Sequence, residues 1–375
     1  MRELANRIWG ESPVSGSYEQ KIGRGRIVAN QPEREVLRQN GIGPDVAVYP
    51  PEAQAQVDYI HRRTAREDIY FLRNPSGEVA DVEVQFRVRG KRPELWNPVL
   101  GETQAAAAYQ ETDAGVRVPL HLPAHGSIFV VFGPGKPREI HILRVRHEGR
   151  AVFPDRTAGA PWCEACLAPD ETIQFQASEP GDYALEFSQG RTRSVTVTAD
   201  AAPVEIAGSW EVRFPAGWDV PTRQVFEALR SWTEATNAAT RTFSGVAVYT
   251  KQFVLASERL RAGQRVRLDL GEVREVARVY LNGREVGISS FTPHVLDITG
   301  VIRAGENSLV IEVANTWLNR LIADDSLPEA QRKTHTNLAR GPGSGPWREA
   351  QPKPSGLLGP VRLLFPQPTF LRATR

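Results

Sequence analysis

Apolar and polar residues alternate in period two along most of this chain, which is typical of strands that bury one face. Four such runs lie at residues 69–72, 82–88, 116–120 and 128–132. Turn-forming stretches at 74–77 and 97–98 separate them at intervals suited to antiparallel pairing. The pattern predicts a small β-sandwich over residues 61–133.

The flanking segments differ from this sandwich. Residues 1–60 combine a helical pattern at the very start with a strand at 25–29 and a helix at 33–39, which predicts a short α/β remnant. A chain that opens directly into a helix resembles the interior of a longer protein, so we expect a truncated origin. Residues 134–200 are again strand-rich, and residues 199–203 are typical of a linker.

The block from 201 to 375 carries the most informative pattern. Strand-like runs lie at 248–254, 265–270, 276–281, 305–315 and 359–364. Asn282-Gly283 favours the positive φ angles of a two-residue hairpin. This inventory predicts a jelly roll. The fold class is therefore mainly β, namely tandem β-sandwiches with a C-terminal galactose-binding-like jelly roll, and no (β/α)₈ repeat is visible.

Composition narrows the classes of partner. The 375 residues are 41% hydrophobic and 24% charged with a net charge of +2, which predicts several globular cores and no field for nucleic acid or an anionic membrane. Arg greatly outnumbers Lys, which we interpret as a GC-rich bacterial genome. No apolar run reaches the ~20 residues of a membrane span, and the N-terminus lacks the apolar segment of a signal peptide.

The two cysteines, Cys163 and Cys166, match the spacing of a redox pair only superficially. A redox pair starts a helix, whose dipole lowers the pKa of the first thiol, whereas the residues that follow here predict a strand. We expect two incidental thiols in a loop. His294 has no neighbouring ligand and no acidic loop has calcium spacing, so no metal is assigned, and calcium stays an open alternative.

Several spaced motifs carry a resemblance to known families. The hairpin at 279–283, Asp297-Ile298-Thr299, the run at 305–309 and the closing 359–361 resemble the sugar-binding domain of glycoside hydrolase family 2. Residues 58–64, 93–98, 208–212, 229–233 and 315–322 are similar to family 106 α-L-rhamnosidases. Where that family continues with Gly-Asp, this chain has Ala323-Asp324-Asp325.

The resemblance implies an accessory role. In family 106 enzymes the catalytic carboxylates lie in a barrel N-terminal to everything seen here, so no catalytic residue can be assigned. We therefore expect a carbohydrate-binding portion of a glycoside hydrolase that acts on rhamnose-containing glycans. The alternatives are a self-sufficient glycosidase with carboxylates on sandwich loops, and a structural module that packs on a separate catalytic domain or subunit. The resemblance also implies a periplasmic or extracellular location.

Sugar sites combine flat apolar faces with directional polar groups, so tryptophans beside Asn, Asp or Arg are the signature to seek. Trp317 continues a strand and is expected in the core, while residues 225–232 have helical spacing that ends at Trp232. Trp347 lies in a Gly- and Pro-rich loop, and Asp324 and Asp325 form an acidic loop. The sugar-binding candidates are Trp232, Trp317, Asn319, Arg320, Asp324, Asp325 and Trp347.

Overall fold

The computed structural model describes residues 2–9, 16–134, 140–168, 170, 172–261, 264–337 and 345–372. Strands dominate, and every pair of named strands is antiparallel. Among these residues no helix combines the length and the apolar character needed to cross a bilayer. The mainly β class expected from the alternating pattern is confirmed.

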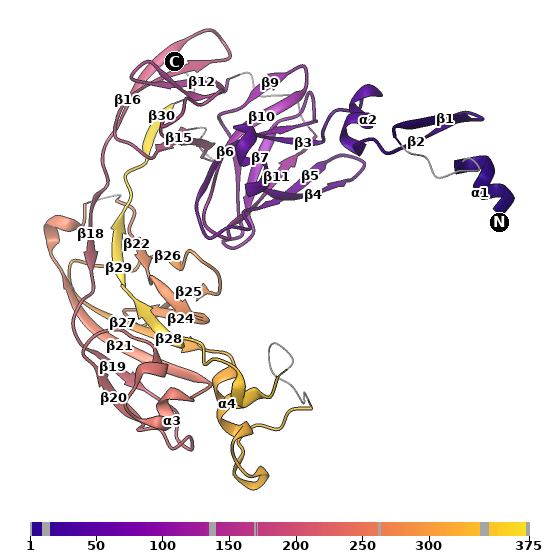
Figure 1. The fold of residues 1–375 in the computed structure, drawn as a ribbon. Helices are drawn as coiled ribbons and strands as arrows, with labels where there is room; N and C mark the ends of the chain where they lie inside the picture. The colour runs from indigo at the N-terminus through magenta and orange to yellow at the C-terminus, as the bar shows by residue number, and fades with distance from the viewer. Residues whose placement is uncertain are drawn as a thin grey trace.

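The N-terminal part projects to one side of the molecule (Figure 1). It contains α1 (Arg2–Trp9), the hairpin of β1 (Tyr18–Ile22) and β2 (Gly25–Ala29), and α2 (Glu33–Gln39). The strand and the second helix lie at the residues where the sequence places them.

The next part is a sandwich of two sheets. Its elements are β3 (Val46–Tyr49), η1 (Pro51–Gln56), β4 (Asp58–Arg63), β5 (Asp68–Arg73), β6 (Ala80–Phe86), β7 (Pro93–Asn97), β8 (Glu102–Ala106), β9 (Gln110–Thr112), β10 (Gly115–Leu122) and β11 (Ser127–Phe132). The sheet β3-β6-β10-β9 faces a larger sheet that contains β8-β7-β11-β5-β4. Tyr70, Phe86 and Phe132 fill the space between them, which is the usual reason for period-two alternation.

The following strands extend this sandwich. They are β12 (Ile142–His147), β13 (Arg150–Phe153), β14 (Cys163–Leu167), β15 (Thr172–Ala177), β16 (Gly181–Phe187) and β17 (Thr192–Val197). Because β14 pairs with β8, the segments on the two sides of residue 133 share one sheet of backbone hydrogen bonds. The last strand of the chain, β30 (Thr369–Arg372), also joins this sheet beside β15. The division into 61–133 and 134–200 therefore remains a proposal.

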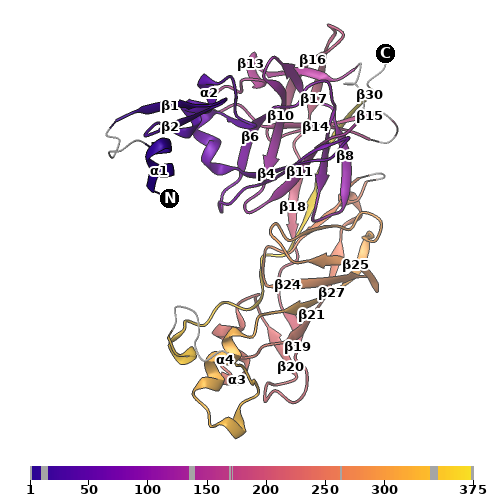
Figure 2. The same cartoon turned by 90° about the vertical axis from the view of Figure 1, so that its right-hand side faces the viewer.

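A second lobe holds the jelly roll (Figure 2). Its strands are β18 (Ala201–Glu205), β19 (Trp210–Arg213), β20 (Arg223–Phe226), β21 (Val246–Leu255), β22 (Arg267–Asp269), β23 (Glu272–Arg274), β24 (Val276–Leu281), β25 (Arg284–Ser289), β26 (Val295–Asp297), β27 (Gly305–Ala314), β28 (Gly356–Gly359) and β29 (Arg362–Phe365). The sheets β18-β29-β22-β26 and β20-β19-β21-β27-β24-β25 enclose one core. The short helices are η2 (Trp232–Glu234), α3 (Ala238–Arg241), η3 (Ser257–Arg259), α4 (Leu318–Asp325), η4 (Glu329–Gln331) and η6 (Trp347–Glu349).

The hairpin expected at Asn282-Gly283 joins β24 to β25. Both turn residues have positive φ, 52° at Asn282 and 79° at Gly283, as a type I′ turn requires. The turn matches the twist of the strands, so it fixes their register, with Leu281 opposite Arg284.

Three local expectations were wrong. Residues 201–203 belong to β18 rather than to a linker, because β29 returns from the end of the chain to pair with them. Residues 223–226 form β20, since pairing of Phe226 with Trp210 outweighs the helical spacing. Trp317 does not lie in the core: β27 ends at residue 314, and the Trp317 side chain is 51% exposed.

Candidate functional site

The acidic pair expected in a loop forms the last turn of α4 instead. Within this helix the Arg320 Nε–H donates to Asp324 Oδ1 at 2.8 Å, and the Nη2 of the same guanidinium also bonds to that oxygen. Both side chains are almost fully buried, with exposed fractions of 9% for Arg320 and 3% for Asp324. The pair is therefore a buried, charge-assisted contact.

The second oxygen of Asp324 is also fully engaged. It accepts the backbone N–H groups of Lys333 and Thr334 at 3.0 and 2.7 Å, and the Thr334 hydroxyl at 2.6 Å. Burial alone would raise the pKa of Asp324, but the hydrogen bonds from Arg320 and Thr334 outweigh it and lower that pKa. Asp324 thus stays ionised and ties α4 to the segment after η4.

Asn319 links the same helix to the approach to β28. Its Nδ2 donates to the Lys353 carbonyl at 2.8 Å and to Ser355 Oγ at 2.9 Å, while its Oδ1 accepts the Lys353 N–H at 2.9 Å. The side chain is buried. Asn319 and Arg320 are both buried, and their hydrogen bonds hold α4 against neighbouring segments.

Asp325 and Trp347 lie nearer the surface. Asp325 Oδ2 accepts the backbone N–H of Arg348 at 3.1 Å and faces its guanidinium at 3.5 Å. Trp347 begins η6 and is half-buried. Residues 341–344 of the Gly- and Pro-rich loop lie outside the described residues. Asp325 is the carboxylate of this cluster that solvent can reach.

Trp232 is a core residue. Its side chain has no exposed surface, and its Nε1–H donates to the Tyr249 hydroxyl at 2.6 Å. That hydroxyl in turn accepts the N–H of Leu357 at 3.1 Å. Buried indoles usually find such a partner. In this position the Trp232 ring is enclosed by the core and has no face to offer a sugar.

Trp317 instead forms an exposed surface with a residue that the sequence did not single out. Its ring centroid lies 5.8 Å from that of Trp218 at an angle of 40°. Trp218 is anchored on the core through an edge contact with Phe243 at 5.4 Å. Lys333 Nζ lies 5.8 Å from the Trp218 centroid and 3.4 Å from the Asp219 carboxylate. We call Trp218 and Trp317 the tryptophan platform.

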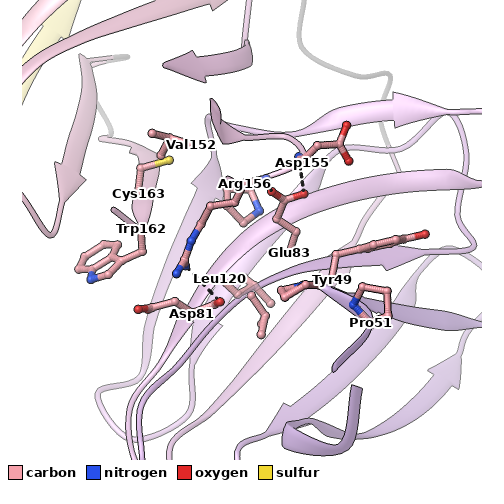
Figure 3. Close-up of a pocket in the computed structure, with 13 residues that line it drawn as sticks. Tyr49, Pro51, Asp81, Glu83, Leu120, Val152, Asp155, Arg156, Trp162 and Cys163 are labelled. Carbon is pink, nitrogen blue, oxygen red and sulfur yellow. Dashed lines mark hydrogen bonds between the residues drawn. The ribbon is translucent and has the colours of Figure 1, made fainter. Parts of the chain in front are cut away.

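A pocket lies on the outer face of the first sandwich, away from every candidate named from the sequence (Figure 3). It encloses about 220 Å³. Tyr49 comes from β3, Asp81 and Glu83 from β6, and Arg156 and Trp162 from the segment between β13 and β14. Asp81 and Glu83 share a face because they are two residues apart in a strand.

Glu83 holds the two walls of the pocket together. It accepts the backbone N–H groups of Asp155 and Arg156 at 3.1 and 2.9 Å, and Arg117 Nη1 lies 3.4 Å away. Burial raises the pKa of Glu83 above its ordinary value, although these backbone hydrogen bonds and Arg117 oppose that effect. Arg117 Nη1 also bonds to Asp155 Oδ1 at 2.6 Å.

Asp81 is less completely engaged. His121 Nδ1 lies 2.6 Å from its Oδ1, while no hydrogen bond within the described residues reaches its Oδ2. Arg156 Nη1 donates to the Asp81 backbone carbonyl at 3.2 Å. The Trp162 ring stacks on His121 with centroids 4.3 Å apart. The pocket thus brings an open carboxylate oxygen, a guanidinium and an indole together.

The two thiols lie in β14 rather than in a loop. Because they lie three positions apart along a strand, they face opposite sides: Cys163 packs in the core around Phe175 and Cys166 in the core around Phe86. Burial raises the pKa of each thiol. Both are free and protonated at neutral pH, and they cannot pair with each other in this geometry.

No group of three or more potential metal ligands occurs among the residues that the structure describes. His294, considered as a lone ligand, is buried, with its Nδ1 2.9 Å from Ser289 Oγ. Burial lowers the pKa of His294, so its ring is neutral at pH 7. It is a hydrogen-bonded core residue.

The fold and the motifs define a class, and comparison with known proteins confirms it. Residues 1–111 match the family model of glycoside hydrolase 106, described as alpha-L-rhamnosidase. Residues 233–352 match the model of the glycosyl hydrolase 2 galactose-binding domain-like family. This is a glycoside hydrolase-related β-sandwich region that ends in a galactose-binding-like domain.

Two individual proteins are similar to this chain. The rhamnosidase from Novosphingobium sp. PP1Y has a similar structure over 97% of this chain, with a TM-score of 0.64 and 29% identity. A putative beta-glucuronidase of Formosa agariphila is 36% identical over 159 residues, or 42% of this chain. The chain spans only 28% of the former and 14% of the latter. The region is rhamnosidase-like.

Proposed function

We propose that this chain is the carbohydrate-binding, accessory portion of a glycoside hydrolase that acts on rhamnose-containing glycans, without a catalytic barrel of its own. The observation that carries the proposal is the likeness to the Novosphingobium rhamnosidase, which extends along 97% of this chain but 28% of that protein. The catalytic activity of that rhamnosidase would then depend on the parts of it that this chain does not cover.

The side chains support a binding role more than a catalytic one. Glycoside hydrolysis needs two carboxyl groups that flank the bond, one of them able to carry a proton. Asp324 is saturated by five hydrogen bonds and ionised, so it cannot serve as the acid. The paired strands form antiparallel ladders rather than the parallel strands of a (β/α)₈ barrel.

The tryptophan platform is our proposed contact surface for the glycan. Trp317 is half exposed and rests on Trp218, so its ring is held in place before a ligand arrives. Sugar rings stack their C–H faces on such indoles, and Lys333 and Asp219 supply polar groups at the edge. Preorganisation of this kind reduces the entropy lost on binding.

Hydrolysis is the first test. Purified chain is incubated with a panel of nitrophenyl glycosides led by the α-L-rhamnoside, beside a complete rhamnosidase as positive control. We expect no nitrophenol release from the chain. Turnover that is lost in Asp325→Asn would overturn the accessory role and place an active site at the end of α4.

Binding is the second test, by calorimetry with rhamnose-containing polysaccharides. Trp317→Ala should weaken binding about tenfold, or ~1.4 kcal/mol, because a stacking face is lost. Phe291→Ala is the matched control, since Phe291 is an aromatic residue of the same lobe with 65% exposure. If no polysaccharide binds, the alternative of a structural module that packs on a catalytic domain or subunit takes the place of this proposal.

A further inference from the structure

The pocket on the sandwich face has the dimensions of a single-ring ligand. Its volume of about 220 Å³ is below the ~300–1,000 Å³ of pockets that take drug-sized molecules. Apolar surface from Pro50, Pro51, Leu120 and Val152 lines it between the polar groups. The ligand would therefore be small and would present both apolar and hydrogen-bonding edges.

The polar groups of the pocket are arranged for hydroxyl groups. Asp81 Oδ2 can accept hydrogen bonds, since only Oδ1 is bonded to His121. Arg156 uses Nη1 on the Asp81 carbonyl, and its Nε and Nη2 donate to nothing among the described residues. In Figure 3 the Arg156 guanidinium and the Asp81 carboxylate lie close together on one side of the pocket. Such an acceptor and donor suit adjacent hydroxyls of a sugar.

The walls add a stacking surface. The Trp162 ring is held flat against His121 at an angle of 21°, which fixes its orientation. The Tyr49 ring is held by the Arg117 guanidinium, whose carbon lies 4.1 Å from the ring centroid. Both aromatic residues are therefore positioned by neighbours from β10 before a ligand enters.

Charge decides which kind of sugar fits. Three carboxylates line the pocket, from Asp81, Glu83 and Asp155, against one lining guanidinium, from Arg156. Arg117, just outside the lining, is paired with Glu83 and Asp155. With Arg117 counted, three carboxylates face two guanidinium groups, so an anionic ligand would meet an excess of negative charge, which would repel it. The balance favours a neutral ligand.

We infer that this pocket binds one neutral monosaccharide unit, with Asp81 and Arg156 as its hydrogen-bonding residues and Trp162 as its apolar wall. The site is separate from the tryptophan platform and goes beyond the accessory role proposed above. It would give the chain a second point of attachment to a glycan, on the other lobe of the molecule (Figure 2).

The test is a titration of the whole chain with L-rhamnose, D-galactose and D-glucuronate, followed by saturation-transfer NMR and by calorimetry. We expect a neutral sugar to bind and glucuronate to bind at least tenfold more weakly. Asp81→Asn and Trp162→Ala, which alter different segments, should each weaken binding of the neutral sugar about tenfold or more. Asp58→Ala is the control, because Asp58, on β4, lies in an exposed ion pair with Arg73, on β5.

The outcomes separate this inference from the proposed function. Unchanged monosaccharide binding in both pocket variants would overturn the pocket as a site, as would tighter binding of glucuronate than of neutral sugars. Polysaccharide binding that is weakened by Trp317→Ala, without any monosaccharide binding to the chain, would overturn the pocket alone. Thermal melts of each variant show whether a loss of binding reflects a loss of folding.

Discussion

The α4 end of the jelly roll holds the buried carboxylate of Asp324, and the pocket on the β6 face holds the half-buried carboxylate of Asp81, yet the two regions use these groups differently. Asp324 has every acceptor position filled by its own chain. Asp81, by contrast, leaves Oδ2 without a hydrogen bond from any described residue, beside the Nε and Nη2 of Arg156, which also lack a partner there. A carboxylate can bind a ligand only through acceptor positions that the fold leaves unused. Asp324 has none left, so we expect it to be structural, whereas Asp81 on β6 keeps one and is the better candidate for a site.

The largest effect should come from breaking the saturated pair. Asp324→Ala leaves the Arg320 guanidinium buried without its partner, so we expect a loss of ~3–5 kcal/mol in the free energy of unfolding. Urea denaturation measures it. Asp325→Ala is the matched control, and its more exposed contact with Arg348 should contribute only ~0–1 kcal/mol. Equal losses of stability in the two variants would mean that the buried Asp324 contributes no more to folding than the more exposed Asp325.

The sequence predicted what depends on neighbours in the chain. The hairpin at Asn282-Gly283 could be read from two residues, because their positive φ angles are a local requirement. The strand and helix of the first 60 residues and the alternation of the sandwich strands follow from the same kind of local rule.

The sites depend on partners far apart in the chain, and here the sequence was a weaker guide. Burial of Trp232 depends on Tyr249 and on Leu357, 125 residues beyond it, and the partners of Asp324 follow nine and ten residues later. The pocket brings Asp81 together with Trp162 across 81 residues. Its one local signal was the alternation of acidic residues on β6, which also fits an ordinary solvent-exposed face.

The stability of the two regions should depend on pH in opposite directions. Burial raises the pKa of Glu83, so the folded state holds its proton more firmly than the unfolded state does. Its contribution to stability is therefore fully present below its ordinary pKa and is lost as pH rises through the folded value. The pKa of Asp324 is lowered instead, so its contribution is present above its ordinary pKa and is lost as pH falls through the folded value.

Glu83→Gln should isolate the first of these two effects. As pH falls from 7 toward 5, the parent chain should gain stability relative to Glu83→Gln, because glutamine cannot take up the proton. Urea titrations at several pH values measure the difference. The effect should be smaller than that of Asp324→Ala, because the backbone donors of Asp155 and Arg156 still find an amide oxygen. A difference that is independent of pH would mean that Glu83 is not buried as an ionisable group.

The smallest effect should come from the outer partner of Arg117. Asp155 is 80% exposed, so its contact with Arg117 Nη1 at 2.6 Å is open to solvent on the Asp155 side. Asp155→Ala leaves Arg117 with the buried carboxylate of Glu83, so no buried charge loses its last partner, and we expect a loss of ~0–1 kcal/mol. The same urea titration measures it. A loss above ~2 kcal/mol in the free energy of unfolding would mean that Asp155, rather than Glu83, balances the charge of the Arg117 guanidinium. The carboxylates of the pocket would then be structural, as Asp324 is in α4.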